Sequence, residues 1–193
     1  MARWEPDSRG RLREAALDLY GERGFENTTV AEIARRAGLT ERTFFRQFAD
    51  KREVLFAGSE ELEAALVTAV AEAPDSVAPL DAVAAGLEAA GARLPQDVGI
   101  ARRRQAIIAA NAELRERELI KLASLSAALA AALRGRGLEE PAANLTAEVG
   151  IAVFRNAFER WIEPGGERSF AELVRDSLAE LRAVTAAVPA PAR

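Results

Sequence analysis

Apolar residues recur every three or four positions along nearly the whole chain, which predicts α-helices. No segment shows the apolar–polar alternation of a half-buried β-strand. The first four helices are expected at residues 8–23, 29–37, 41–48 and 51–73. After a break at the prolines that follow, five more are expected at 79–94, 97–110, 111–134, 141–162 and 169–188. The pattern therefore predicts an all-α fold.

Residues 28–53 contain two short helix signals joined by a glycine turn. Thr29 and Glu32 have the spacing of a capping box, so the first short helix is expected to begin there. Gly38 tolerates the left-handed backbone conformation that commonly ends a helix, and Thr40 is a suitable N-cap for the next one. These residues favour a tight turn between the two helices.

The second short helix has two chemically different sides. Phe44 and Phe48 lie four residues apart, so they can be buried together. The other side is rich in polar, hydrogen-bonding side chains, namely Arg42, Thr43, Arg46 and Gln47. Two short helices with a tight turn, the second rich in donors, are typical of a helix-turn-helix that reads the DNA major groove.

Two further pairs repeat the capping-box spacing. Asp50 and Glu53 are expected to open the long fourth helix, which would run straight from the helix-turn-helix into the rest of the chain. Ser169 and Glu172 are expected to open the last helix.

The last two expected helices differ in their apolar patterns. The final helix has a single apolar stripe, whereas the helix at 141–162 is apolar on more than one side. A helix that is apolar around most of its circumference is buried on both sides. It is either a core helix within one subunit or a helix with one side against a symmetry mate, and the pattern leaves both interpretations open.

The composition excludes several kinds of chemistry. The chain has no histidine and no cysteine, which excludes disulfides and Ser-His-Asp or Cys-His sites and makes a metal site unexpected. No phosphate loop or nucleophile–base pair is present, so we assign no catalytic residue and no cofactor and expect no enzyme. The N-terminus is too polar for a signal peptide, and no apolar run approaches about 18 residues. We therefore expect a cytoplasmic protein without a membrane segment.

The net charge of −4 is unusual for a DNA-binding protein, but its distribution is uneven. Residues 33–52 contain six basic and two acidic side chains, while acidic residues predominate after residue 56. Positive charge is therefore concentrated where DNA phosphates would lie. Solvated helix faces would give the same pattern, so charge alone does not decide between the two interpretations.

Residues 10–56 resemble the N-terminal signature of the TetR (tetracycline-repressor-like) family of bacterial transcriptional regulators. The residues that carry the resemblance are Gly24-Phe25, Thr28-Thr29-Val30, Glu32-Ile33-Ala34, Ala37-Gly38-Leu39-Thr40, Thr43-Phe44-Phe45, Phe48 and Lys51. The resemblance implies a helix-turn-helix DNA-binding domain at 1–50 and an effector-binding and dimerisation domain at 51–193. It also implies a homodimer, with the last two helices of each subunit in a four-helix interface and the central helices around an effector pocket.

The resemblance assigns DNA contacts by position. Thr40 matches a residue whose hydroxyl and helix N-terminus face phosphate. Thr43 matches a threonine that commonly contacts DNA, and Lys51 matches a lysine that binds backbone phosphate. The full set of candidate DNA contacts is Thr29, Thr40, Arg42, Thr43, Phe45, Arg46, Gln47 and Lys51.

Three of these residues depart from the family pattern. Arg42 stands where the family often has Gly, and Gln47 where it often has His, although an amide still donates to phosphate. Phe45 stands where the family usually has Tyr, so the phosphate-binding hydroxyl is missing, and Arg46 is a candidate to replace that contact.

Arg42 is the candidate for reading a base. Arginine pairs bidentately with guanine, which contributes about 1–3 kcal/mol of discrimination. The alternative is a salt bridge with a neighbouring carboxylate, Glu41 or Asp50.

The effector pocket is expected to be mostly apolar. Its candidate residues are Leu62, Leu66, Leu87, Arg103, Ile107, Leu122, Phe154, Phe158 and Trp161. Each apolar member is more often a plain core residue than a ligand contact. Three consecutive arginines, residues 102–104, cannot share one helix face, so one of them pointing inward would suit an anionic amphiphile such as an acyl thioester. A solvated face is the alternative.

Together these patterns predict a ligand-responsive DNA-binding transcriptional regulator. We expect a repressor that binds a palindromic operator as a homodimer and is released by a small apolar or amphipathic effector. The alternative is an all-helical small-molecule-binding or scaffold protein with a vestigial helix-turn-helix.

Overall fold

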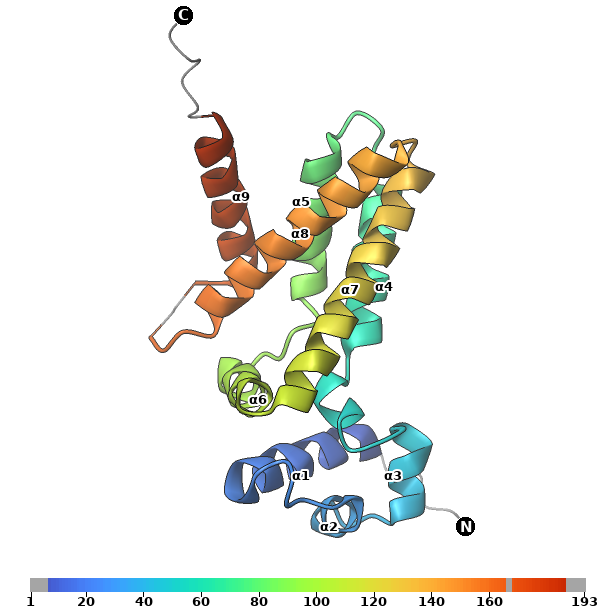
Figure 1. The fold of residues 1–193 in the computed structure, drawn as a ribbon, viewed down its shortest axis with the longest axis vertical. Coiled ribbons are helices and arrows are strands. Elements are labelled where there is room, and N and C mark those ends of the chain that lie inside the picture. The colour runs from blue at the N-terminus through green and yellow to red at the C-terminus, as the bar shows by residue number, and fades with distance from the viewer. Residues whose placement is uncertain (1–6, 166–167, 187–193) are drawn as a thin grey trace, which may run out of the picture. The chain divides into compact units, whose positions relative to one another are not determined.

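The computed structural model describes residues 7–165 and 168–186, and in these ranges the chain forms α-helices and one 3-10 helix but no strand (Figure 1). The elements are α1 (Ser8–Arg23), α2 (Val30–Arg36), α3 (Glu41–Gln47), η1 (Glu53–Phe56), α4 (Ser59–Glu72), α5 (Pro79–Gly91), α6 (Val98–Ala110), α7 (Ala112–Gly135), α8 (Glu140–Trp161) and α9 (Phe170–Ala186). The predicted all-α fold is confirmed. The expected end of the last helix, at 187–188, lies outside the described residues.

The helices form two compact units. The first contains the chain up to Ser59 together with Gly99–Ile120, and the second contains Glu60–Val98 and the chain from Lys121 onward. The chain therefore passes between the units three times. The contacts between residues place η1, α6 and the first turns of α7 in the same unit as the N-terminal helices. The predicted functional boundary at residue 50 stays a prediction.

The first unit is built around a hydrophobic core of aromatic and branched side chains, to which α1, α2, α3 and η1 all contribute. Leu12, Ile33 and Phe44 are completely buried, and Tyr20 packs against Phe25 with ring centroids 5.3 Å apart. Each such burial contributes roughly 1.5–3 kcal/mol. This core holds α2 and α3, which have only seven residues each and are too short to be stable alone.

The turn between α2 and α3 follows the sequence prediction closely. Thr29 and Glu32 form the predicted capping box, in which the Glu32 amide donates to Thr29 Oγ1 at 3.3 Å and the Thr29 amide donates to Glu32 Oε2 at 2.9 Å. Gly38 has a φ of 67°, in the left-handed region that favours glycine. The Arg11 guanidinium group of α1 donates to the Ala37 carbonyl and so links this turn to α1.

The predicted long helix over residues 51–73 is wrong. The segment forms the 3-10 helix η1, leaves helical geometry at Ala57, reverses at Gly58 with a φ of 93°, and begins again as α4 at Ser59. Three consecutive residues of η1 (Val54, Leu55 and Phe56) are all buried in the core of the first unit. The extended backbone at Ala57 and the left-handed Gly58 end this segment, so α4 begins as a separate helix.

Asp50 and Glu53 form only half of the predicted capping box. The Asp50 carboxylate accepts the amides of Arg52 at 2.8 Å and Glu53 at 3.2 Å, which caps η1 rather than a long helix. The Glu53 carboxylate instead forms an ion pair with Arg117 of α7, with an N–O distance of 2.6 Å.

The second unit packs α5 against both α8 and α9, and α8 against α9. Small residues permit these close contacts. A Cβ atom at Gly150 of α8 would lie 2.6 Å from Val83 Cγ1 of α5. The guanidinium group of Arg136 donates to carbonyls at the end of α4 and in the turn that follows, including Val70 at 3.1 Å. The predicted capping box of Ser169 and Glu172 is present at the start of α9.

Candidate nucleic-acid interface

The recognition helix α3 is attached to the core by one side. Phe44 is completely buried and Phe48, which ends the helix, is 5% exposed, and their ring centroids lie 5.6 Å apart. The Arg9 guanidinium group of α1 lies 5.5 Å from the centroid of the Phe48 ring. Glu41, Arg42, Phe45 and Arg46 are exposed, and Thr43 and Gln47 are half-buried at the edges of this side.

The N-terminus of α3 is capped by a pair of threonines. Thr40 Oγ1 accepts the Thr43 amide at 3.2 Å, and the two hydroxyl oxygens lie 3.0 Å apart. Both hydroxyls therefore sit at a helix N-terminus, where free amides and the helix dipole favour an anion such as phosphate. Thr29 is placed similarly at the start of α2, although its hydroxyl donates to Glu32 at 2.9 Å.

Arg42 and Arg46 are exposed on α3. Within the described ranges, neither guanidinium group has an ion-pair partner, including the proposed partner Glu41. Asp50 is held instead by Arg52, with an N–O distance of 2.6 Å. Burial raises the pKa of Asp50, but hydrogen bonds from Arg52 and Glu53 outweigh that effect and lower it overall. Two cations on α3 are thus left available to an external anion.

Lys51 occupies a different environment from the other candidate cations. Its ammonium group donates to the carbonyls of Phe25 at 2.8 Å, Thr28 at 3.1 Å and Glu26 at 3.4 Å, and lies 4.3 Å from the centroid of the Phe25 ring. The Lys51 carbonyl accepts the hydroxyl of buried Tyr20 at 2.6 Å. An ammonium group has three protons. Lys51 therefore fastens the loop between α1 and α2 to the end of the helix-turn-helix, and its phosphate contact stays a prediction.

The remaining candidate on α3, Gln47, is half-buried. Its amide donates to Ser8 Oγ of α1 at 3.4 Å, a long bond that a phosphate oxygen could replace. Among the eight candidate DNA contacts, the structure thus gathers six along α3 and its N-cap, with Thr29 and Lys51 at the edges of the same unit.

Sequence reasoning missed a set of ion pairs that fastens α6 and α7 to η1. Arg104 donates to the Leu55 carbonyl at 2.5 Å, lies 5.2 Å from the centroid of the Phe56 ring, and reaches Glu118 at 3.5 Å. Burial lowers the pKa of Arg104, and Glu118 opposes that effect. Arg52 also pairs with Glu113 of α7 at 2.8 Å. One of the three consecutive arginines therefore does point inward, but into the first unit.

The predicted effector residues are divided between the two units. Arg103 and Ile107 belong to α6 in the first unit, where Arg103 is exposed and pairs with Asp18 at 3.2 Å. The other seven belong to the second unit, where Leu66 and Leu87 are completely buried. In the second unit, α8 and α9 also form an aromatic cluster, with centroid separations of 5.7–6.2 Å; its members are Phe154, Phe158, Trp161 and Phe170. Whether any of these residues touches an effector stays a prediction.

Two features seen in many other protein classes are absent from the described part of the chain. It contains no cluster of acidic side chains that could hold a metal ion. None of its helices is long and apolar enough to cross a membrane.

Comparison with known protein families agrees with the DNA-binding geometry. Residues 12–57 match the family described as bacterial regulatory proteins, tetR family. Residues 77–186, more than half of the chain, match the family described as the MftR C-terminal domain. The chain belongs to the TetR family. It is therefore a transcriptional regulator rather than an enzyme.

Individual relatives of this TetR-family chain are distant. The HTH-type transcriptional regulator TcmR of Streptomyces glaucescens is 35% identical over 82 residues, which cover 42% of this chain and 36% of TcmR. This chain thus matches only about a third of TcmR's length.

Two solved structures share the fold. FadR of Thermus thermophilus, a TetR-family repressor in complex with lauroyl-CoA, has a TM-score of 0.56 and 23% identity over 96% of this chain and 98% of its own. A transcriptional regulator of Pseudomonas aeruginosa PAO1 has a TM-score of 0.63 and 20% identity over 96% and 94%.

Replacement of Lys51 by Met is expected to destabilise the protein as well as to affect DNA binding. The substitution removes the ammonium donor from the partly buried carbonyls of Phe25 and Thr28 and leaves the Thr28 carbonyl without this partner, which costs about 1–3 kcal/mol in the free energy of unfolding. Chemical denaturation measures this cost. Arg46→Ala is the matched control, because an exposed side chain without an ion pair changes stability by less than about 0.5 kcal/mol. Equal stability of the Lys51→Met variant and the wild type would contradict the structural role of the ammonium group.

Proposed function

We propose that this TetR-family regulator is a repressor, which binds a palindromic operator as a homodimer and is released by a small apolar or amphipathic effector. The observation that carries the DNA-binding part is the exposed face of α3. That face presents Arg42 and Arg46 without ion-pair partners among the described residues, beside the N-terminal threonine pair. Cations and free helix amides on one face form an arrangement suited to the phosphates and base edges of a major groove.

Within this interface we assign Arg42 to base reading and Arg46 to phosphate binding. Arg42 lies near the start of α3, and the N-terminal residues of a recognition helix are those that usually reach base edges. Arg46 lies one turn later and takes over the phosphate contact for which the side chain of Phe45 has no hydroxyl.

Selection of binding sites from random duplex DNA tests the assignment. The wild-type protein is expected to enrich a palindrome with a G·C pair in each half-site. Arg42→Ala should lose about 1–3 kcal/mol of discrimination at that base pair. Arg46→Ala should weaken binding to all sequences by the same factor. Arg46→Ala should also show a shallower dependence of affinity on salt, because its cation displaces a counterion from phosphate. An unchanged preference in Arg42→Ala would contradict the base contact, and the absence of any enriched duplex would favour a vestigial helix-turn-helix.

The dimer part of the proposal is supported by apolar side chains exposed on the last two helices. Leu145 of α8 is 67% exposed and Val184 of α9 is 73% exposed. Val149 and Ala152 follow Leu145 at helical spacing, so α8 carries an apolar stripe on the side away from its buried residues. This favours the second interpretation of the 141–162 pattern, in which one side of the helix meets a symmetry mate.

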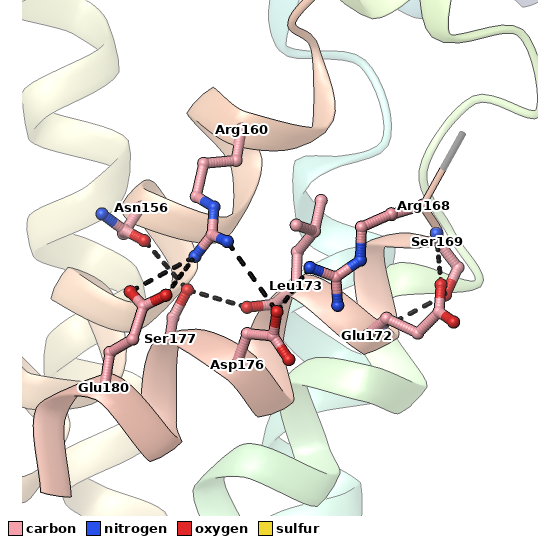
Figure 2. A network of polar contacts seen from close by, with 9 residues as sticks. All are labelled: Asn156, Arg160, Arg168, Ser169, Glu172, Leu173, Asp176, Ser177 and Glu180. Atoms are coloured by element: carbon pink, nitrogen blue, oxygen red, sulfur yellow. Dashed lines mark hydrogen bonds and ion pairs between the residues drawn. The ribbon is translucent and has the colours of Figure 1, made fainter. Parts of the chain in front are cut away.

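A polar network links α9 to the C-terminal half of α8 (Figure 2). Arg160 of α8 reaches Glu180 at 3.2 Å and Asp176 at 3.8 Å, and Arg168 reaches Asp176 at 2.5 Å. Hydrogen bonding to Arg168 lowers the pKa of Asp176, so the carboxylate stays charged at neutral pH. Because the contacts link both helices, each subunit would offer its half of a four-helix interface as one rigid pair.

Leu145→Glu is expected to convert the dimer into a monomer, because it buries an unpaired carboxylate in each half of the symmetric interface. Analytical ultracentrifugation at micromolar concentration measures the mass. Ala179→Glu is the control, since Ala179 is an exposed position of α9 about 140° around the helix from Val184. A Leu145→Glu protein that still sediments as a dimer would place the interface elsewhere.

The effector part of the proposal is supported by half-buried aromatic rings. Phe154 and Phe158 stack with centroids 5.9 Å apart, and neither ring is fully covered in the second unit. Half-covered apolar rings suit the acyl chain of an amphiphile, and the related fold of Thermus thermophilus FadR was solved with lauroyl-CoA.

An effector of this class is expected to raise the Tm of the protein and to weaken operator binding. By linkage, the loss of DNA affinity equals the difference in effector affinity between the free and the DNA-bound protein. Thermal unfolding with lauroyl-CoA, lauric acid and coenzyme A separates the contributions of the acyl chain and the anionic group. If none of the three stabilises the protein or displaces it from operator DNA, the acidic-amphiphile hypothesis is wrong.

A further inference from the structure

Phe45 is the one aromatic among the large apolar side chains that the described residues leave exposed. The residue is 56% exposed and lies on α3, on the face that also carries the unpaired arginines. Its ring is not free to lie anywhere, because it meets the completely buried ring of Phe44 edge to face, with centroids 5.5 Å apart and an interplanar angle of 81°. The core therefore holds an apolar ring outward from the recognition helix.

A phenyl ring has no hydrogen-bonding group, so Phe45 is unable to donate to a phosphate oxygen. The apolar group that a major groove presents is the C5-methyl of thymine, and phenylalanine contacts that methyl group favourably. Arg42 precedes Phe45 by three residues, so the two side chains are neighbours on the helix surface. If Arg42 reads a guanine, the ring beside it lies within reach of the neighbouring base edges.

We propose that Phe45 is a specificity-determining residue that contacts a thymine methyl group in each half of the operator, close to the base pair read by Arg42. The inference rests on the proposed DNA-binding function and adds to it the recognition of a second base pair. The phenyl ring, exposed in the free protein, becomes covered only when a methyl group is present at the matching position. The contact adds an A·T preference to the G·C preference of Arg42.

Replacement of thymine by uracil tests the contact, because it removes the methyl group and leaves every hydrogen-bonding group of the base pair in place. Each thymine of the selected operator is replaced singly by dU, and affinity is measured by fluorescence anisotropy at constant salt. For the wild-type protein, one position in each half-site is expected to lose about fourfold in affinity, the value for one buried methyl-sized group. Phe45→Ala is expected to bind the thymine and uracil duplexes equally.

Three controls separate a direct contact from a change in structure. Phe45→Leu and Phe45→Tyr keep an apolar body and should retain a preference for thymine over uracil at the same position. Arg42→Ala should retain it as well, because the methyl contact does not use the guanidinium group. Thermal unfolding of each variant shows whether α3 remains folded, and the dU substitutions measured with the wild-type protein carry the test if Phe45→Ala unfolds.

The outcomes distinguish this inference from the proposed function. If no duplex is enriched in the selection, DNA binding itself fails. If an operator is found but no thymine is sensitive to dU, or the sensitivity is the same in the wild type and in Phe45→Ala, the methyl contact is overturned while DNA binding stands. A loss of affinity in Phe45→Ala that is equal for thymine and uracil would assign the ring to a sugar contact instead.

Discussion

The structure of the first unit, which contains the helix-turn-helix, depends on the burial of one side of a very short helix. A helix of seven residues gains too few internal hydrogen bonds to form alone, so α3 exists because Phe44 and Phe48 are buried against α1. The same constraint determines the chemistry of the other side. With two rings fixed in the core, helical geometry leaves Arg42, Phe45 and Arg46 toward solvent. Base-reading candidates are thus positioned by packing rather than by contacts of their own.

Charged groups support this packing from two directions. Lys51 ties the loop after α1 to the end of the helix-turn-helix, and Arg104 ties α6 to η1. Both cations are partly buried: Lys51 donates to three backbone carbonyls, and Arg104 donates to the Leu55 carbonyl and to side-chain oxygens of Gln105 and Glu118. An isolated surface ion pair contributes little, whereas a cation that satisfies otherwise unpaired buried carbonyls prevents a real loss of stability. These contacts make α6 and the start of α7 part of the first unit.

That grouping changes how an effector signal would reach DNA. A single long fourth helix would have been the one rigid link, but Gly58 interrupts it. The unbroken element is α7, whose first residues belong to the first unit and whose later residues belong to the second. Within the first unit, the start of α7 is held to η1 by ion pairs such as Glu53 with Arg117.

The sequence by itself determined the features that depend on near neighbours along the chain. Capping boxes at Thr29 and Ser169, the glycine turn at Gly38 and the two-sided pattern of α3 all follow from local spacing, and so did the all-α fold. The tertiary structure alone decided which charges find partners. Arg52 pairs with Glu113 of α7, Lys51 donates to three carbonyls, and Arg104 packs against the Phe56 ring. Such choices depend on groups that the chain brings together only after it has folded, so no local pattern encodes them.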